Sequence, residues 1–365
     1  MTFEVFLYIV LGSYVTMVCI LLYGLTRKQI TSLEKPSSFI SIIIAARNEE
    51  DVIATCLESV ANQTYPLSKY EIIVADDGSI DNTEVICQSF INRYAHIKVI
   101  KVLEKKDSLR GKANALAQGI DHAKGDIILI TDADCTVPPT WVEETAKRYS
   151  DNVGLVGGCT LQKASKPFEG IQSLDWAFIL GLASSVAGLG KPLGSIGNNL
   201  SFRKTAYDEC GGYRNLKFSV TEDYTVVQAI VGSQKWKYCY PLEPKHLVES
   251  QACQDLKTLI RQKHRWGKGG LDMIISGFLI MVIGFLMHLS PFIMLYWGDV
   301  VVASSIMMVK FVFDYIFLYQ VLRRLQRTDE LKWFYWFEVY YIIYVILLPF
   351  VVFFGGKVKW KGREF

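Results

Sequence analysis

The stretch Phe39-Ile-Ser-Ile-Ile-Ile-Ala-Ala46 is a nearly continuous apolar run that ends at Arg47. Such a run is typical of a strand buried on both faces of a parallel sheet. Three stretches of the same kind follow along the chain, at Tyr70–Ala75, Ile97–Leu103 and Asp126–Thr131. The sequence therefore predicts a set of buried strands within an α/β domain that covers residues 38–255.

Helical stretches separate these strands, at Glu50–Asn62, Asp81–Arg93 and Lys112–Ala123, and Asp81 is placed to cap the second of them. Strands that alternate with helices of about a dozen residues predict βαβ units and a mostly parallel sheet. Sheets of this class bind ligands beyond the carboxyl ends of their strands, where the strand order reverses. The residues directly after each strand are therefore the candidates for a functional site.

Acidic residues follow two of the strands, Asp76-Asp77 after the second and Asp132-Ala133-Asp134 after the fourth. Two such clusters at one edge of a sheet repel each other unless a positive group lies between them. An Asp-x-Asp pair can supply oxygen ligands to Mg²⁺ or Mn²⁺, which in turn bridges phosphates. Turn formation and helix capping would explain one cluster alone. Two clusters at equivalent places, with Lys112 nearby, favour a site for a metal ion and a diphosphate.

Two other phosphate-binding patterns are excluded by their spacing. A P-loop requires Lys followed by Ser or Thr, but the chain has Gly111-Lys112-Ala113 and Gly190-Lys191-Pro192. A dinucleotide fingerprint requires G-x-G-x-x-G after the first strand, where the chain has Ala45-Ala46-Arg47-Asn48-Glu49.

Two later segments carry further candidates. Thr221-Glu222-Asp223 opens an apolar helix, where the acids act either as caps or as the acidic patch that an acceptor hydroxyl needs. Gln262, Arg265 and Trp266 lie on a basic amphipathic segment, Asp255–Lys268. That segment alone is typical of a membrane-surface helix. The three side chains stand at i, i+3 and i+4, however, so they share a face and can act together.

The composition narrows the class of protein. Of 365 residues, 51% are hydrophobic and 21% charged, which excludes a disordered chain. The net charge of +3 gives no support to a nucleic-acid partner. The 8 cysteines form no C-x-x-C pair and no zinc spacing. We interpret them as buried thiols in a reducing compartment, which favours a cytosol-facing domain.

Apolar stretches at both ends of the chain predict membrane spans. Val5–Leu25 is long enough to cross a bilayer and is followed by basic residues, so it is a retained helix rather than a signal peptide, with a cytoplasmic C-terminal end. Met273–Gly298, Val300–Leu322 and Trp333–Phe354 follow near the C-terminus. In the second of these, Lys310 and Asp314 stand four residues apart and can neutralise each other.

The positive-inside rule leaves the side of the C-terminal tail open. Three spans after a cytoplasmic domain would place the tail outside. Its basic residues predict the inside instead; they are Lys357, Lys359, Lys361 and Arg363. Either the positive-inside rule does not hold for this tail, or one of the apolar stretches does not cross the membrane.

Taken together, these motifs resemble the membrane-bound family-2 glycosyltransferases, a family of inverting enzymes that includes cellulose and hyaluronan synthases and ceramide glucosyltransferases. The similarity runs from the first strand to the Gln262 helix, and the tail Trp360-Lys361-Gly362-Arg363 is also similar. It implies an α/β GT-A nucleotide-sugar domain with a mostly parallel sheet, flanked by transmembrane helices. The implied division is an N-terminal helix at 1–30, the GT-A domain at 31–254, an amphipathic interface helix at 255–270 and a membrane region at 271–365.

The resemblance also implies roles for the residues at the donor end. Asp77, with Asp76 beside it, matches the acid that binds the nucleotide base, usually uracil. The segment from Ala46 to Glu49 matches the one that flanks base and ribose, although Ala45-Ala46-Arg47 departs from the hydroxyl and aromatic residues of many relatives. Lys112 matches a lysine near the diphosphate. Asp132 and Asp134 match the Asp-x-Asp motif that binds Mg²⁺ or Mn²⁺. Of the two, the resemblance favours Asp134 as the direct metal ligand.

At the acceptor end, the resemblance makes Asp223 the catalytic base. Glu222 and the set Gln262, Arg265 and Trp266 match residues at the diphosphate and acceptor end. Gly197-Asn198-Asn199 matches a loop that lines the acceptor side.

The implied function is inverting transfer of a sugar from a nucleotide-sugar, by resemblance a UDP-sugar, to a lipid or lipid-linked acceptor. The catalytic domain would be cytoplasmic on a multi-pass protein of the cell membrane. One alternative is a processive polysaccharide synthase, for which the predicted spans are few unless a partner subunit or a dimer supplies the remainder. An alternative of another class is a membrane transporter or scaffold whose α/β domain only senses a nucleotide.

Overall fold

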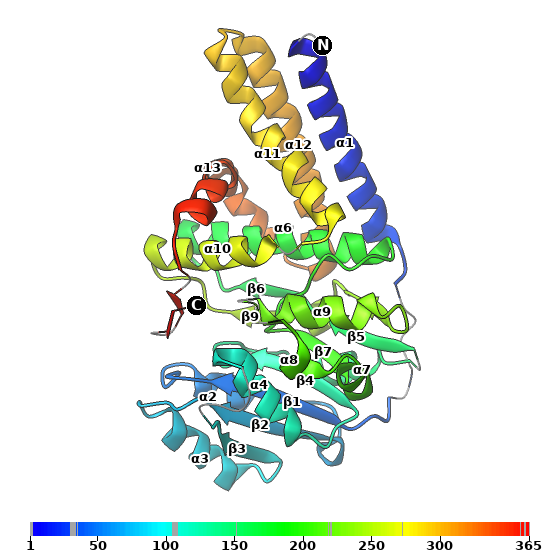
Figure 1. Ribbon diagram of the computed structural model, residues 1–365, viewed down its shortest axis with the longest axis vertical. Coiled ribbons are helices and arrows are strands. Elements are labelled where there is room, and N and C mark those ends of the chain that lie inside the picture. The colour runs from blue at the N-terminus through cyan, green and yellow to red at the C-terminus, as the bar shows by residue number, and fades with distance from the viewer. Residues whose placement is uncertain are drawn as a thin grey trace. The chain divides into compact units, whose positions relative to one another are not determined.

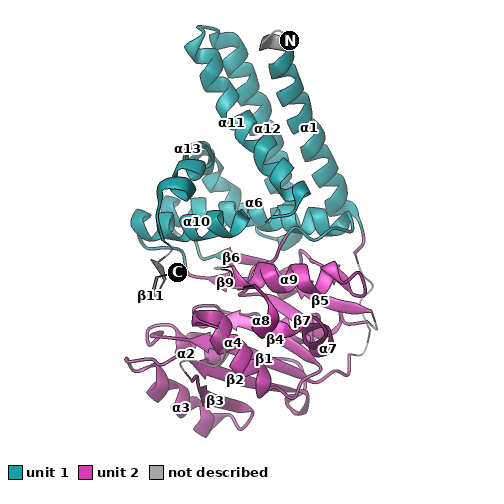
Figure 2. Cartoon of the chain, viewed as in Figure 1, with its two compact units in different colours: residues 1–27, 162–193, 252–365 teal, residues 28–161, 194–251 magenta. Residues whose placement is uncertain are grey.

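The structure is a computed structural model that describes residues 3–29, 34, 36–103, 109–150, 152–217, 219, 221–271, 273–357, 359–360 and 363–364. The chain divides into two compact units (Figure 2). The helical unit consists of residues 1–27, 162–193 and 252–365. The α/β unit consists of residues 28–161 and 194–251.

The α/β unit is built on a seven-stranded sheet in the order β3-β2-β1-β4-β7-β5-β8 (Figure 1). The first four strands are parallel, whereas β7 runs antiparallel to both of its neighbours, so the sheet is mixed but mostly parallel. The strands are β1 (Ile40–Ala46), β2 (Tyr70–Asp76), β3 (Ile97–Lys101), β4 (Ile127–Asp132), β5 (Val153–Gly157), β7 (Leu200–Arg203) and β8 (Lys237–Cys239). A separate pair joins β6 (Thr160–Gln162) and β9 (Val248–Ser250).

The predicted strands are confirmed to within two residues at every end. Their apolar runs are needed because both faces of the sheet are covered: Ile42 and Ile44 belong to one core cluster and Ile43 to another, and all three are fully buried. The prediction of an α/β fold with a mostly parallel sheet is therefore confirmed.

Helices cover both faces of this sheet. The face with Ile42 carries α2 (Ile53–Ala61), α3 (Thr83–Arg93) and α5 (Trp141–Ala146). The face with Ile43 carries α4 (Gly111–Asp121), α7 (Lys204–Glu209), α8 (Gly212–Asn215) and α9 (Glu222–Gly232). Helix α3 begins two residues later than predicted, so its N-cap residue is Asn82 and not Asp81. Oδ1 of Asp81 nevertheless accepts the Thr83 N–H at 3.0 Å.

The strand order reverses between β1 and β4, because β2 lies on one side of β1 and β4 on the other. In the register of the sheet, Ala46 pairs with Asp76 and Ala45 pairs with Asp132. The ends of β2 and β4, with their acidic residues, therefore flank the end of β1. This is the place where open sheets of this class bind ligands.

The helical unit contains long apolar helices that pack on one another. They are α1 (Phe3–Thr26), α6 (Pro167–Gly188), α11 (Ile275–Tyr296), α12 (Val300–Leu325) and α13 (Phe334–Phe354), accompanied by the shorter α10 (Leu256–Gly270). Within the described residues, five helical segments are long and apolar enough to cross a membrane: Val5–Thr26, Pro167–Gly188, Ile275–Tyr296, Val300–Leu325 and Thr328–Phe354. By their length and composition, these helices indicate a membrane protein.

Helix α6 was not predicted as an apolar helix. Its mean hydropathy of 1.2 is the lowest of the five, since Glu169 and Asp175 interrupt it. The sequence-based division placed it inside the domain at 31–254, whereas the structure groups residues 162–193 with the helical unit. There α6 packs against α1, α12 and α13.

Buried charged side chains on α12 and α13 of the helical unit form ion pairs with one another. Nζ of Lys310 lies 2.8 Å from Oδ2 of Asp314, as the spacing of the two residues predicts, and 2.5 Å from Oε2 of Glu338 on α13. The Tyr14 hydroxyl of α1 donates to Asp314. In the C-terminal tail, Lys359–Trp360 pairs with Arg363–Glu364, while Lys361 and Gly362 of the predicted family tail lie outside the described residues.

Candidate functional site

Lys112 lies at the centre of an acidic cluster in the α/β unit. It sits in the first turn of α4, and its Nζ is 2.5 Å from Oδ1 of Asp132 at the end of β4 and 3.6 Å from Oε1 of Glu222 at the start of α9. Burial acts to lower the pKa of Lys112, but Asp132, Glu222 and Asp223 outweigh it and raise the pKa above its ordinary value. The side chain therefore remains an ammonium ion that offsets the repulsion between these carboxylates.

Asp223 is held by two backbone N–H groups. Its Oδ2 accepts from Gly197 at 2.8 Å and its Oδ1 accepts from Tyr224 at 2.8 Å. A Cβ atom built on Gly197 would lie 3.3 Å from Oδ2 of Asp223 and 3.4 Å from Nζ of Lys112. The absence of a side chain at Gly197 thus lets the loop backbone approach both groups.

The capping interpretation of Thr221-Glu222-Asp223 is only partly correct. Helix α9 begins at Glu222, and Thr221 makes no side-chain cap bond. Both acids lie in the first turn, where the helix dipole favours negative charge. Glu222, however, faces Lys112, so its carboxylate belongs to the acidic cluster.

The loops after β1 and β2 meet at the other side of the site. Asp76 is buried, and its Oδ1 accepts from the N–H and the hydroxyl of Ser79, at 3.1 and 2.5 Å. Asp77 donates its N–H to the carbonyl of Ala46 at 2.8 Å. Nη1 of Arg47 donates to the carbonyl of Asp77 at 2.5 Å and lies 3.9 Å from its Oδ2. Asp76 therefore shapes the turn, whereas the Asp77 carboxylate lies beside a guanidinium group.

Hydrogen bonds join these two loops into one surface. The Glu49 N–H donates to Oγ1 of Thr83 at 2.8 Å, and the Asn48 N–H donates to Oγ of Ser79 at 3.0 Å. Oδ1 of Asn48 accepts the Ile80 N–H at 2.9 Å. Asn48 adopts a left-handed backbone with φ 52°, which Asn tolerates better than most residues. The segment from Ala46 to Glu49 is thus a braced turn next to Asp76 and Asp77.

The resemblance assigns the Gly197-Asn198-Asn199 loop to the acceptor side, and both Asn side chains of this loop are buried. Asn199 is fully buried; it donates to the carbonyls of Cys159 and His246 and accepts from Nε1 of Trp141 at 3.0 Å. Asn198 is also buried and accepts from Thr160 at 2.8 Å. These side chains brace the loop, and the contact with Asp223 comes from the Gly197 backbone.

Gln262, Arg265 and Trp266 lie on α10, in the helical unit, and are half-buried. Asp255 caps this helix, accepting the Thr258 N–H at 2.7 Å. The Trp266 ring lies 5.4 Å from the Trp176 ring of α6, measured between centroids. The structure therefore brings Lys112, Asp132, Glu222 and Asp223 together within the α/β unit, whereas Gln262, Arg265 and Trp266 belong to the other unit.

The sequence placed Arg47 and Gly197 within matched segments but did not predict their contacts. These are the hydrogen bond from Arg47 to the Asp77 carbonyl and the one from the Gly197 N–H to Asp223. Both depend on loop conformations, for which the sequence carries no local signal, although the place of Arg47 directly after a strand made it a candidate.

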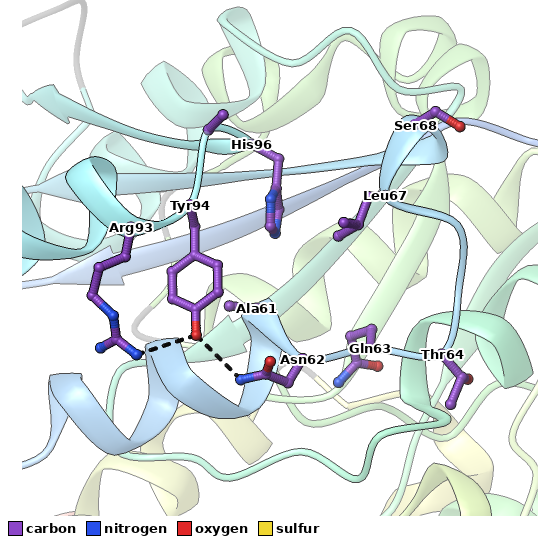
Figure 3. A pocket seen from close by; sticks show the side chains of 10 residues that line it. Ala61, Asn62, Gln63, Thr64, Leu67, Ser68, Arg93, Tyr94 and His96 are labelled. Carbon is purple, nitrogen blue, oxygen red and sulfur yellow. Dashed lines mark hydrogen bonds between the residues drawn. The ribbon is translucent and has the colours of Figure 1, made fainter.

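A cavity of about 800 Å³ lies at the amino-terminal ends of β2 and β3, opposite to the strand ends that carry the acidic residues (Figure 3). Its walls come from the segments that precede β2 and β3 and include Asn62, Arg93, Tyr94 and His96. None of the predicted site residues lines it. It is therefore separate from the strand ends that carry the acidic cluster.

The comparison with protein families decides the assignment. Residues 41–225, which contain the strand ends, Lys112 and Asp223, match the model described as glycosyl transferase family 2. The chain belongs to glycosyl transferase family 2.

Several proteins named as glycosyltransferases or as synthases of glycolipids and polysaccharides are similar in sequence to this chain. Glycosyltransferase AglE of Haloferax volcanii is 37% identical over 33% of this chain and 38% of its own. β-Monoglucosyldiacylglycerol synthase of Nostoc sp. is 28% identical over 64% of this chain and 49% of its own. Poly-β-1,6-N-acetyl-D-glucosamine synthase of Staphylococcus epidermidis is 27% identical over 66% of this chain and 56% of its own. The chain thus spans about half the length, or less, of these relatives.

Among solved structures, a mannosyltransferase from Pyrobaculum calidifontis, in complex with GDP-Man and Mn²⁺, matches 95% of this family-2 chain and 96% of its own. The TM-score is 0.63 and the sequence identity 16%. This similarity confirms the GT-A fold.

Proposed function

We propose that the chain transfers a sugar from a nucleotide-sugar to a lipid or lipid-linked acceptor, with inversion at the anomeric carbon. The observation that carries this proposal is the group formed by Lys112, Asp132, Glu222 and Asp223 at the strand ends of a family-2 chain. Similarity to a relative named as a glucosyldiacylglycerol synthase supports a lipid acceptor.

Asp223 is the proposed base. The N–H groups of Gly197 and Tyr224 each bind one of its oxygens and hold the carboxylate in one orientation. In that orientation it takes the proton of an acceptor hydroxyl, whose oxygen forms a bond to the anomeric carbon as the bond to the diphosphate oxygen breaks. Attack opposite to the leaving group inverts the configuration.

Asp134 and Asp132 are the proposed ligands of Mg²⁺ or Mn²⁺. Carboxylates are suitable ligands for either ion, but the described residues contain no group of three His, Cys, Asp or Glu side chains that could hold one. The set therefore suits an ion that takes its remaining oxygen ligands from a diphosphate. Bound there, the metal would stabilise negative charge on the leaving diphosphate. Lys112 already carries a positive charge at this edge and would add to that stabilisation.

The nucleotide base is assigned to the surface made by Ala46, Glu49, Asp76 and Asp77. Since Asp76 is engaged by Ser79, Asp77 is the carboxylate that would bind the base. Arg47 beside it would offer N–H donors to base carbonyls, so the donor preference of this chain need not follow that of relatives with other residues there.

Gln262, Arg265 and Trp266, with Glu222, are assigned to the diphosphate and acceptor end. The proposed division remains a first helix at 1–30, a catalytic region within 31–254, the interface helix at 255–270 and a membrane region at 271–365, with α6 added to the membrane region. A cytoplasmic catalytic unit on a multi-pass protein of the cell membrane is part of the proposal, and the basic residues after two of the helices support it; they are Arg27, Lys28, Arg323, Arg324 and Arg327.

A second candidate is a processive polysaccharide synthase. It is favoured by similarity to the poly-β-1,6-N-acetyl-D-glucosamine synthase over 66% of this chain. A nucleotide-sensing scaffold would not need Asp223 and Lys112 in one cluster, so we rank it last.

Nucleotide release from detergent-purified protein tests the proposal. UDP- and GDP-sugars are supplied with Mn²⁺, Mg²⁺ or EDTA, with and without membrane lipid extract, and products are separated by size. We expect metal-dependent release from one donor, increased by lipid, with one sugar per lipid. A ladder of products would favour the synthase. Release that Asp223→Asn leaves unchanged, or none from any donor with lipid and metal present, would contradict the proposal.

A further inference from the structure

Lys263 is buried in the middle of α10. The helix is basic and amphipathic, yet Lys263 is only 3% exposed. Burial of an ammonium group is costly unless it is paired. Its partner is Asp175 on α6, which is 0% exposed and forms an ion pair with Lys263 through Oδ2. Asp175 is one of two acidic residues in α6, and this ion pair explains why its carboxylate can be buried there.

Aromatic side chains enclose the ion pair. The Tyr340 hydroxyl of α13 donates to the same Oδ2 of Asp175 at 3.0 Å. Nζ of Lys263 lies 4.3 Å from the ring centroid of Trp266 and 5.1 Å from that of Tyr344. Attraction between a cation and an aromatic ring is strengthened where both are desolvated. The pair thus joins three helices, α6, α10 and α13.

This geometry restricts rotation of α10 about its axis. Turning the helix would withdraw the ammonium from the carboxylate and leave both charges buried without a partner, which is strongly unfavourable. Trp266 stands one turn after Lys263 and packs on Trp176, the residue next to Asp175. Arg265 follows Lys263 by two residues, about 200° around the helix, so it points away from Asp175.

We infer that Lys263 and Asp175 are positioning residues that fix the rotation of α10 and thereby aim Trp266 and Arg265. The effect on sugar transfer rests on the proposed function, in which these two residues act on the diphosphate and the acceptor. The restriction of α10 itself is a property of the helical unit and is tested without any substrate.

Cysteine labelling tests the rotation directly. Leu259 is 2% exposed and lies one turn before Lys263 on the same face, whereas Ile260 is 46% exposed. Cysteine is placed at either position in the full chain, and maleimide labelling is read by peptide mass spectrometry. We expect Leu259→Cys to be protected and Ile260→Cys to label readily. Adding Lys263→Met should increase labelling at position 259 by about tenfold, because the helix turns or opens locally.

Kinetics test the consequence for transfer. Lys263→Met should lower kcat by about 100-fold with the donor KM changed by less than about twofold, since only the aim of α10 is lost. Lys257→Met is the matched control, because Lys257 is an exposed lysine of the same helix. The double variant Lys263→Met/Asp175→Leu removes both charges of this pair, so neither is left buried without its partner, and it should keep the wild-type melting temperature. Its kcat should nevertheless stay at least about tenfold low.

These measurements separate the inference from the proposed function. If wild-type protein transfers no sugar, the labelling experiment still decides whether Lys263 restrains α10. Unchanged protection at position 259 in the Lys263→Met background would overturn the inference. A folded double variant with wild-type kcat would overturn it as well.

Discussion

Nζ of Lys112 lies 2.5 Å from Oδ1 of Asp132, so the first turn of α4 is joined to the end of β4 by an ion pair. Without a donor, the ammonium neutralises part of the acidic cluster at the sheet edge. In the proposed reaction the same charge is available to the diphosphate. The Lys112 ammonium thus has two roles: it stabilises the cluster of carboxylates when no donor is bound, and in the proposed reaction it stabilises charge on the leaving diphosphate.

Lys112→Met should lower kcat by about 10²–10³-fold, since it removes a positive charge from the site where negative charge develops. The measurement is nucleotide release at saturating donor and metal. Lys124→Met serves as the control, because Lys124 is an exposed lysine just beyond the other end of α4. Retention of wild-type kcat by Lys112→Met would remove the residue from the catalytic assignment.

Asp223→Asn should abolish transfer while leaving donor binding intact, because the amide cannot accept the proton of the acceptor hydroxyl. Gly197→Ala is a subtler test of the same group. The added Cβ would lie 3.3 Å from Oδ2 of Asp223, so the carboxylate has to shift by a few tenths of an ångström. We expect kcat to fall about tenfold with an unchanged donor Kd by calorimetry. Weaker donor binding in either variant would place Asp223 on the donor rather than the acceptor.

Lys310→Met should destabilise the helical unit by about 3–5 kcal/mol, since it leaves the buried carboxylates of Asp314 and Glu338 without their cation. The readout is the apparent melting temperature in detergent. Adding Glu338→Gln and Asp314→Asn should restore much of the loss. Arg323→Met on the exposed side of α12 is the control and should change little.

His246 should make the α/β unit sensitive to acid. Burial, with Arg148 adding to its effect, lowers the pKa of His246 from 6.5 to about 3. The unfolded chain binds a proton below pH 6.5, whereas the folded chain does not until about pH 3. The free energy of unfolding therefore decreases by about 1.4 kcal/mol per pH unit as the pH falls through this window. Above pH 6.5 the contribution of His246 to stability is fully present.

Melting temperatures at pH 7, 6 and 5 would check this, with His246→Gln expected to flatten the dependence. Gln can retain a hydrogen bond to Thr145, whose Oγ1 lies 2.8 Å from Nε2 of His246. The exposed His122 supplies the control substitution His122→Gln, which should leave the slope as in wild type. An unaltered slope in His246→Gln would mean that other groups cause the acid sensitivity.

The strands and the acidic clusters could be predicted because their signals are local. A short apolar run such as Ile42–Ile44, rich in β-branched side chains, favours a buried strand, and Asp76 and Asp132 follow such runs directly. Helix α6 could not be recognised, since the charge of Asp175 is explained only by Lys263, far away in the sequence. The burial of Asn199 was missed for the same reason: its partners are the carbonyls of Cys159 and His246, supplied by distant segments.

Helix α6 belongs to the helical unit but lies in the sequence between the two parts of the α/β unit, and this order affects how the protein is synthesised. The polypeptide leaves the α/β unit after residue 161 and returns at residue 194, and only then supplies β7 and β8. During synthesis, β7 therefore emerges from the ribosome after α6, and the sheet cannot be completed before that apolar helix exists. The α/β unit therefore completes its sheet only after α6 has been made, and trimming both termini would still leave α6 between the two parts of that unit.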